Sequence, residues 1–161
     1  MNPKIRKALT YGLPALAALA LLIQLVPVTR DNPPVVGDLA APPEVKALLK
    51  RVCYNCHSHE TEWPFYSYIA PVSWLVAADV HEARTWVNFS KWSEQSEMAR
   101  TFIRQNVWSM IEKDKMPPWN YRLMHPESHL TEAEKATIET WANAPAAPAA
   151  ESSPEPAPSA P

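Results

Sequence analysis

The chain has 161 residues, a formal net charge of −2 and no basic stripe beyond its extreme N-terminus, which excludes the electrostatic footprint of a nucleic-acid-binding protein. A chain of this length forms one domain of about 100–150 residues with additional segments. The 18 prolines crowd both ends of the chain, so we expect neither end to belong to the folded core.

The N-terminal segment, residues 1–30, has the pattern of a membrane anchor. Lys4, Arg6 and Lys7 form a positive lead, and residues 8–28 then carry no charged side chain. As a helix, this uncharged stretch would be about 31 Å long, enough to cross a hydrocarbon core of about 30 Å. Since the positive lead stays in the cytoplasm, we expect the lipid bilayer to hold residues 8–28 and the remainder to be exported. A cleaved signal peptide is the alternative, although the stretch lacks a convincing small-residue cleavage site.

Two further segments are expected to lack regular structure. Residues 31–43 contain two Pro-Pro pairs, which disfavour helix and sheet and predict an extended linker. Residues 143–161 consist almost entirely of Ala, Pro, Ser and Glu. Such a tail cannot bury enough apolar surface to fold, so we expect it to be disordered.

Between these segments, residues 44–142 are expected to form an all-α domain. Apolar side chains recur at helical spacing over residues 44–52, 72–86 and 96–112. Thr131 and Glu134 form a capping box that opens a last helix. The intervening segments 58–71 and 121–130 are expected to be loops, and no stretch has the strict alternation of a strand.

The only two cysteines of the chain lie in the sequence Cys53-Tyr54-Asn55-Cys56-His57. This is the attachment pattern of a c-type haem. Each thiol can add to one vinyl group of the porphyrin, and the two-residue gap lets both sulfurs reach one edge of the ring. The adjacent histidine is then carried under the iron as its proximal ligand. We therefore expect one covalent haem c per chain, with His57 bound to iron.

A disulfide, a dithiol redox site and half of a zinc site are the alternatives for the cysteine pair. A dithiol site is expected beside a strand–helix unit, and no strand pattern is visible. Structural zinc usually has a second pair of ligands at short spacing, for which His125 and His129 are the only candidates. The haem interpretation uses both cysteines and leaves none over.

Met116 is the best candidate for the sixth ligand of such an iron. It lies in a turn stiffened by Pro117 and Pro118, from which a thioether can be aimed at the metal, and it would raise the reduction potential relative to a second imidazole. Met110 falls on the apolar face of a helix and is expected to pack in the core. The other candidates are Met98, Met124, His59, His81, His125 and His129. Of these, we expect His81 to be a solvated or core-edge residue and His125 to fix its loop by a hydrogen bond.

A spaced set of short sequences accompanies the cysteine motif. In order they are Cys53-Tyr54-Asn55-Cys56-His57-Ser58, Trp63-Pro64-Phe65-Tyr66-Ser67, Ile69-Ala70-Pro71-Val72-Ser73-Trp74, Asn88-Phe89-Ser90, Met116-Pro117-Pro118-Trp119, His125-Pro126 and Leu130-Thr131-Glu132-Ala133-Glu134. With them, the chain resembles a bacterial membrane-anchored family, the haem-binding domain family, and is similar to the small mono-haem cytochromes c. The resemblance covers nearly all of the exported domain.

The resemblance implies a small cytochrome c-like helical domain around one covalent haem, preceded by a single transmembrane helix. It implies Cys53 and Cys56 as attachment sites, His57 as the proximal ligand and Met116 as the distal ligand. No Gly-Pro pair follows the proximal histidine, so Pro71 is our candidate for the carbonyl that orients its imidazole. Trp63 and Trp119 are expected to be walls of the haem pocket. Because haem c is attached on the exported side of bacterial membranes, the expected location is the inner membrane, with the domain in the periplasm.

These expectations favour an electron-transfer protein that exchanges electrons with redox partner proteins at the membrane. The alternative from another class is a haem-based sensor or ligand-binding module, in which the sixth position opens. An enzyme such as a peroxidase would need an open distal side with an acid–base residue, and no distal histidine paired with an arginine is evident from the spacing. We therefore expect no enzymatic activity.

Overall fold

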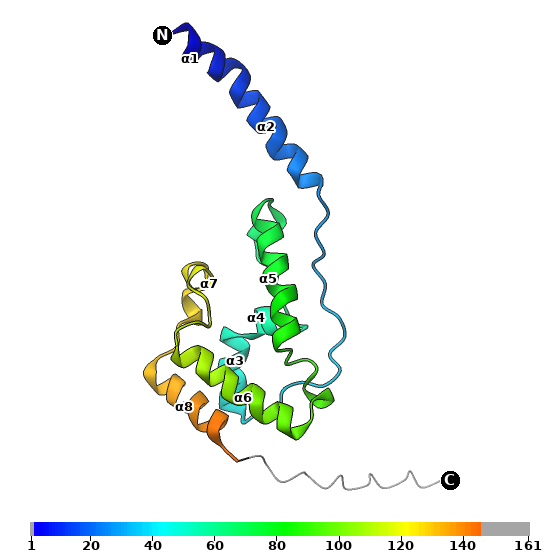
Figure 1. The fold of residues 1–161 in the computed structure, drawn as a ribbon, viewed down its shortest axis with the longest axis vertical. Coiled ribbons are helices and arrows are strands. Elements are labelled where there is room, and N and C mark those ends of the chain that lie inside the picture. Colours follow the sequence, from blue (N-terminus) through cyan, green and yellow to red (C-terminus); the bar gives the residue numbers. More distant parts are fainter. Residues whose placement is uncertain (1, 146–161) are drawn as a thin grey trace, which may run out of the picture.

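The computed structural model describes residues 2–145 and shows an all-helical protein (Figure 1). Within that range no strand forms, and one isolated parallel bridge joins Gly37 to Lys91. An apolar helix extends away from a helical domain, and an extended segment runs from the end of that helix along the domain (Figure 1). The tail expected from residue 143 onward lies outside the described residues, except that Asn143 ends the last helix and two residues follow it.

The N-terminal helix is continuous from Pro3 to Leu25 and none of its window of highest hydropathy is buried. It comprises α1 (Pro3–Lys7), the π-helical turn η1 (Ala8–Gly12), α2 (Leu13–Leu22) and the 3-10 turn η2 (Ile23–Leu25). Its 23 residues are long and apolar enough to cross a membrane, a property that a signal sequence shares.

The hydrophobic core lies where three helices meet. These are α3 (Pro43–Val52), α6 (Glu97–Glu112) and α8 (Glu132–Asn143), and α8 packs against both of the others. The buried core residues are Leu39, Val45, Leu49, Tyr54, Phe89, Trp92, Ile111, Ile138, Trp141 and Ala142. Tyr54 belongs to the cysteine motif and stacks on Phe89 with ring centroids 5.2 Å apart, so the motif is built directly onto the core.

A second group of helices surrounds the motif. The long helix α5 (Val72–Trp86) packs against the short helix α4 (Tyr54–His57) and the 3-10 turn η3 (Phe65–Tyr68). Two 3-10 turns, η4 (Trp92–Glu94) and η5 (Pro126–Ser128), and the helix α7 (Trp119–Met124) complete the domain.

The predicted helices are confirmed where periodicity or a cap marked them. The structure has helices at Pro43–Val52, Val72–Trp86 and Glu97–Glu112, and Thr131 and Glu134 form the capping box of α8. The segment 121–130 is not simply a loop, because α7 and η5 occupy most of it. On α6, Phe102 is 69% exposed, although it is one of the apolar side chains at helical spacing in residues 96–112.

The proline-rich segment after the N-terminal helix is extended, as expected, and it is hydrogen-bonded along the domain. Asn32 exchanges two hydrogen bonds with the backbone of Thr61, with N···O distances of 2.9 and 3.2 Å. The amides of Val36 and Gly37 both donate to the carbonyl of Ser90. A Cβ at Gly37 would lie 2.0 Å from the Ser93 hydroxyl oxygen, so this close approach requires glycine.

Asp38 links this segment to α3 and to the cysteine motif. Its carboxylate accepts hydrogen bonds from the Tyr54 hydroxyl (2.7 Å) and the Leu39 amide (2.8 Å), and it pairs with Lys46. Burial alone would raise the pKa of Asp38, but these hydrogen bonds outweigh it, so the pKa is lowered. The carboxylate therefore stabilises the fold above its unfolded-state pKa, and that stabilisation is lost as the pH falls through the lower folded-state pKa.

We expect Asp38→Asn to lower the free energy of unfolding by about 1–2 kcal/mol at pH 7. The difference from the wild type should shrink as the pH falls below about 4, where the wild-type carboxylate is itself protonated. Urea unfolding of the full chain in detergent, followed by circular dichroism at both pH values, measures this. Glu112→Gln on the exposed side of α6 is the control. Equal losses for the two variants at pH 7 would contradict the prediction.

Candidate functional site

The two cysteines lie where α3 gives way to α4. The Cys53 amide donates to the Leu49 carbonyl (2.8 Å), and the amides of Cys56 and His57 both donate to the Cys53 carbonyl (3.1 and 2.9 Å). In this tight turn, residues three apart share one side, so the thiols of Cys53 and Cys56 are neighbours. Both are partly exposed and no disulfide joins them, an arrangement that leaves two thiols free to react with one ligand.

The imidazole of His57 is oriented by the last turn of α5. Its Nδ1 lies 3.1 Å from the carbonyl oxygens of both Ala83 and Val87. Because both partners are acceptors, Nδ1 carries the proton, and Nε2 presents a lone pair. Within residues 2–145, Nε2 has no hydrogen-bond partner, so it is free to bind a metal. The Val87 carbonyl lies at the C-cap of α5, where carbonyls lack intrahelical partners. The Ala83 carbonyl also accepts from the Val87 amide (3.0 Å), and it can serve both because a carbonyl oxygen has two lone pairs.

Pro71 does not orient this imidazole, and our expectation for it was wrong. Its carbonyl accepts a hydrogen bond from the Trp74 amide (3.1 Å), and it precedes the first turn of α5. Ala83 and Val87 lie at the other end of the same helix. The carbonyls that orient His57 thus come from the end of a helix. The expectation, taken from the common small cytochromes, was a proline carbonyl.

The surroundings of the motif favour neutral side chains. Burial raises the pKa of Cys53 to about 12, and burial together with the nearby Asp79 carboxylate raises that of Cys56 to about 11. Burial lowers the pKa of His57, and this effect is larger than the opposite effect of the hydrogen bonds to the Val87 and Ala83 carbonyls. The resting state therefore holds two thiols and a neutral imidazole.

This electrostatic setting bears on the alternatives for the cysteine pair. A redox dithiol requires a thiolate, which a pKa of about 11 or higher disfavours. Moreover, no group of three or more His, Cys, Asp or Glu side chains in the described part of the chain is placed to hold a metal ion. A thioether is uncharged, so covalent attachment of a porphyrin suits these partly buried sulfurs.

A set of polar side chains ties the motif to α7 and η3. The Asn55 amide donates to the Tyr121 hydroxyl (2.9 Å), and the Tyr121 ring stacks on His125 with centroids 4.2 Å apart. His125 Nδ1 donates to the Glu127 carboxylate (2.9 Å), so Nε2 accepts from the Tyr66 hydroxyl (2.7 Å). The prediction that His125 fixes its loop by hydrogen bonds is confirmed.

The structure also gives two other histidines definite partners. His59 is buried, its Nδ1 donates to the Pro34 carbonyl (2.9 Å) and its Nε2 accepts from Asn88 (2.8 Å). With both nitrogens occupied, His59 holds the linker rather than a metal. His81 is exposed at the domain edge, as expected, and its Nε2 lies 3.1 Å from the Thr29 carbonyl.

Met116 is an exposed residue beside an open hollow. It is 39% exposed and lines an open hollow of about 200 Å³ together with Ile111, Arg122 and His129. None of Cys53, Cys56 and His57 lines that hollow. Its role as an iron ligand therefore stays a prediction.

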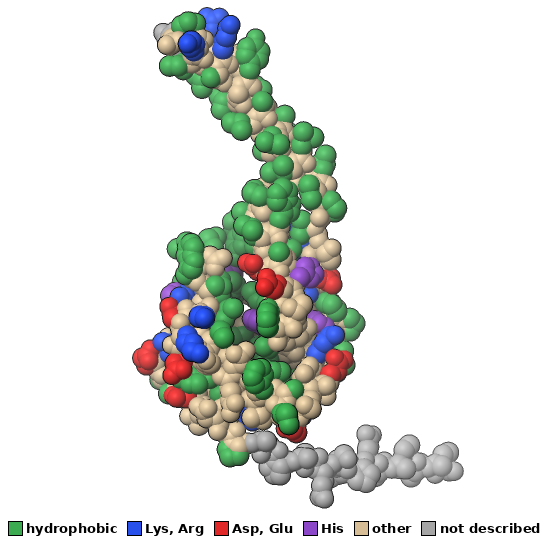
Figure 2. Space-filling model, viewed as in Figure 1, with side chains coloured by type: hydrophobic (Ala, Val, Ile, Leu, Met, Phe, Trp, Pro, Cys, Tyr) green, Lys and Arg blue, Asp and Glu red, His purple; other side chains and the backbone are tan. Residues whose placement is uncertain are grey.

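Several observations show that the surroundings of the motif fit a haem. The indole nitrogen of Trp63 is buried without a hydrogen-bond partner, the only such side-chain atom within residues 2–145. An unsatisfied N–H of this kind indicates a missing acceptor, and the carboxylates of a haem are acceptors. Figure 2 shows the surface hollowed between α5 and the α7 segment, both of which contact α4.

The helices beside this hollow also expose unusually large apolar side chains. Leu75 and Trp86 of α5 are 65% and 77% exposed, and Trp119 and Leu123 of α7 are 73% and 72% exposed. Trp119 was expected to be a pocket wall, and it does not pack in the protein core. Apolar surface of this extent indicates a ligand or partner that covers it, and a porphyrin ring has the required apolar faces.

Sequence reasoning missed the residues that hold the motif in place. Ala83 and Val87 act through their carbonyls, which no residue type marks. Arg84 donates hydrogen bonds to the Ser58 carbonyl (2.7 Å), the Asn32 side chain (3.0 Å) and the Thr61 hydroxyl (2.9 Å). The one signal in the sequence for this role of Arg84 was an arginine at helical spacing from apolar residues of α5.

Comparison with known proteins was informative at the level of the family. No curated protein and no solved structure matches this chain. A family model described as the haem-binding domain matches residues 18–144, which include the cysteine motif, the polar side chains around it and most of the core. The chain therefore belongs to the haem-binding domain family.

Proposed function

We propose that this haem-binding protein is a one-electron carrier that holds a single haem c. The haem would be attached through Cys53 and Cys56, with His57 as its proximal ligand. The observation that carries the proposal is the orientation of His57, the residue after Cys56: its Nδ1 is held 3.1 Å from two carbonyls, and its Nε2 has no partner in the described part of the chain.

Covalent attachment would need no oxidant. Each thiol S–H adds across a vinyl C=C bond, so that one C–S bond forms and the hydrogen is transferred to the neighbouring carbon. When bound, the haem would supply a one-electron couple, taking an electron from a donor protein and returning it to an acceptor protein.

The chain's own residues would then position the group and set its surroundings. The carbonyls of Ala83 and Val87 keep the His57 ring in one tautomer and increase its basicity as a ligand. Trp63 would donate its unsatisfied N–H to a haem carboxylate. The apolar side chains of α5 and α7 would limit access of water and so tune the potential.

The N-terminal helix would anchor the domain on the periplasmic side of a bacterial inner membrane. Its length and apolar composition support this, and Lys4, Arg6 and Lys7 would remain in the cytoplasm. Redox partner proteins at the membrane would then exchange electrons with the haem, and no catalysis is proposed.

Met116 is proposed as the sixth ligand, and absorption spectroscopy tests this. The full chain, purified with its haem, should show the weak ferric band near the red edge that marks His/Met ligation, and Met116→Ala should abolish it. Met110→Leu, a half-buried methionine on α6, is the matched control and should retain the band. The ferrous wild type should bind carbon monoxide poorly, because both axial positions are filled.

A wild type that lacks this band and binds carbon monoxide readily would contradict the carrier proposal. It would favour the alternative function, a haem-based sensor or ligand-binding module with an open sixth position. The observation that favours this alternative is that Met116 is 39% exposed and lines a hollow whose lining does not include His57.

A further inference from the structure

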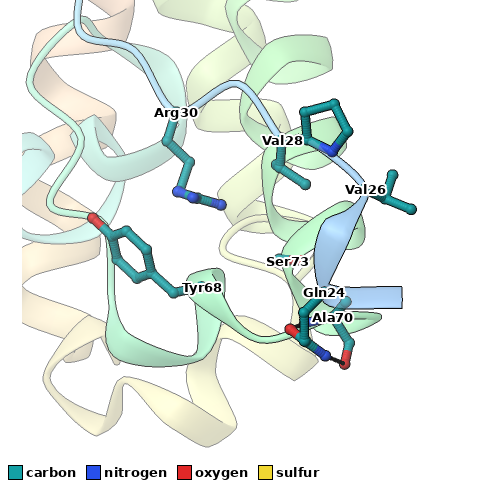
Figure 3. Close-up of a pocket in the computed structure, with 8 residues that line it drawn as sticks. Gln24, Val26, Val28, Arg30, Tyr68, Ala70 and Ser73 are labelled. Carbon is teal, nitrogen blue, oxygen red and sulfur yellow. Dashed lines mark hydrogen bonds between the residues drawn. The ribbon is translucent and has the colours of Figure 1, made fainter. Parts of the chain in front are cut away.

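The end of the N-terminal helix is joined directly to the domain. Gln24, in the last turn of that helix, pairs with the backbone of Ala70: its amide nitrogen donates to the carbonyl (3.2 Å) and its oxygen accepts from the amide N–H (2.9 Å). Figure 3 shows this pair beside an open hollow of about 270 Å³. Ala70 links η3 to α5, so this turn of the domain lies at the same level as the end of the helix.

Arg30 holds the same turn from a second side. Its guanidinium donates to the Ser67 carbonyl (3.0 Å) and lies over the ring of Tyr68, 4.3 Å from the centroid. The turn is therefore fixed between Gln24 and Arg30, and the domain is not suspended from the helix by a free linker.

The turn carries exposed apolar side chains beside these attachments. Phe65, Tyr68 and Ile69 are 73%, 57% and 52% exposed. Gln24 lies within the uncharged stretch of residues 8–28, so in a membrane it would stand near the boundary between hydrocarbon and head groups. Side chains fixed at that depth would meet lipid. Tyr68 and Arg30 suit the interface between lipid and water, where aromatic rings and long cationic side chains reach the head groups.

We propose that Phe65, Tyr68 and Ile69 form a second membrane contact, embedded in the surface of the bilayer that the N-terminal helix spans. The inference rests on the anchoring proposed above. It implies a fixed orientation of the domain, with α5 leading away from the lipid. Ala83, whose carbonyl holds His57, is eleven residues beyond Val72, about 16 Å further along the helix axis.

Labelling from within the lipid tests the contact. The full haem-loaded chain is reconstituted in phosphatidylcholine–phosphatidylglycerol vesicles that contain a trace of a phospholipid with an acyl-chain diazirine. After illumination, mass spectrometry compares adducts on peptides covering residues 8–25, 65–72 and 97–112. The last peptide is the internal control, because Met98 and Phe102 are 84% and 69% exposed on α6.

We expect residues 65–72 to be labelled about tenfold more than residues 97–112, and within about threefold of residues 8–25. Labelling of 65–72 no higher than that of 97–112, with residues 8–25 strongly labelled, would overturn the inference and leave the anchor intact. Absence of label from both 8–25 and 65–72 would overturn the anchor and the inference together. The haem spectrum of the same sample reports separately on the proposed carrier function.

A variant tests the attachment itself. Gln24→Leu keeps the helix apolar but removes both hydrogen bonds to Ala70, so labelling of residues 65–72 should fall by about threefold while that of 8–25 is retained. Thr10→Val is the matched control, since the Thr10 hydroxyl bonds only within the helix, to the Arg6 carbonyl (2.8 Å). Unchanged labelling in Gln24→Leu would overturn the role of Gln24 in setting the depth of the contact.

Discussion

Replacing both Cys53 and Cys56 with alanine is expected to abolish covalent retention of haem. In the wild type, haem should stay with the chain through denaturing electrophoresis and acid–acetone extraction, and alkaline pyridine should give a haem c spectrum. The double variant can still bind through His57, but that bond does not survive denaturation. Its haem should therefore be extracted completely and give a haem b spectrum.

The single variants refine this prediction. Cys53→Ala and Cys56→Ala should each keep one thioether, and the pyridine spectrum should lie between those of haem c and haem b. Met110→Leu is the control for a sulfur on a helix that has no proposed link to the porphyrin. Extractable haem b from the wild type, or haem retained by the double variant under denaturing conditions, would contradict covalent attachment at these residues.

The helices that sequence reasoning predicted well are those whose signals are local. Apolar spacing predicted α5 and a capping box predicted α8, because the helical period and the cap depend only on residues close in the sequence. The helix α4 was missed because its four residues are too few to show a period. Most of the segment containing α7 was assigned to a loop, since a helix of only six residues that follows two prolines also shows no clear period.

The site shows the same division between local and distant information. Spacing alone indicated Cys53, Cys56 and His57, because haem attachment depends on that spacing. The carbonyls that orient His57 could not be predicted, since every residue has a carbonyl and only the fold selects Ala83 and Val87. The choice of Pro71 was wrong for this reason. The docking of the linker likewise depends on partners far along the chain, such as Asn32 with Thr61.

Arg84 is the residue whose loss is expected to destabilise this arrangement most. Its side chain is 9% exposed and donates to the Ser58 carbonyl next to His57, to Thr61 and to Asn32, and it pairs with Asp31. Arg84→Met keeps much of the apolar stem but removes the donor to two buried acceptors, the Ser58 carbonyl and the Thr61 hydroxyl. We expect the free energy of unfolding to fall by about 3 kcal/mol, measured by urea unfolding of the haem-loaded chain in detergent.

Arg51→Met is the matched control, because Arg51 pairs with Glu134 at the surface with 37% of its side chain exposed. An exposed pair of this kind contributes less than about 1 kcal/mol. A second readout separates a general loss of stability from a local role: Arg84 follows Ala83 in α5, so Arg84→Met should also shift the haem absorption bands in the folded protein, and Arg51→Met should not. Equal destabilisation by the two variants, with unchanged spectra in both, would show that Arg84 does not support the position of His57.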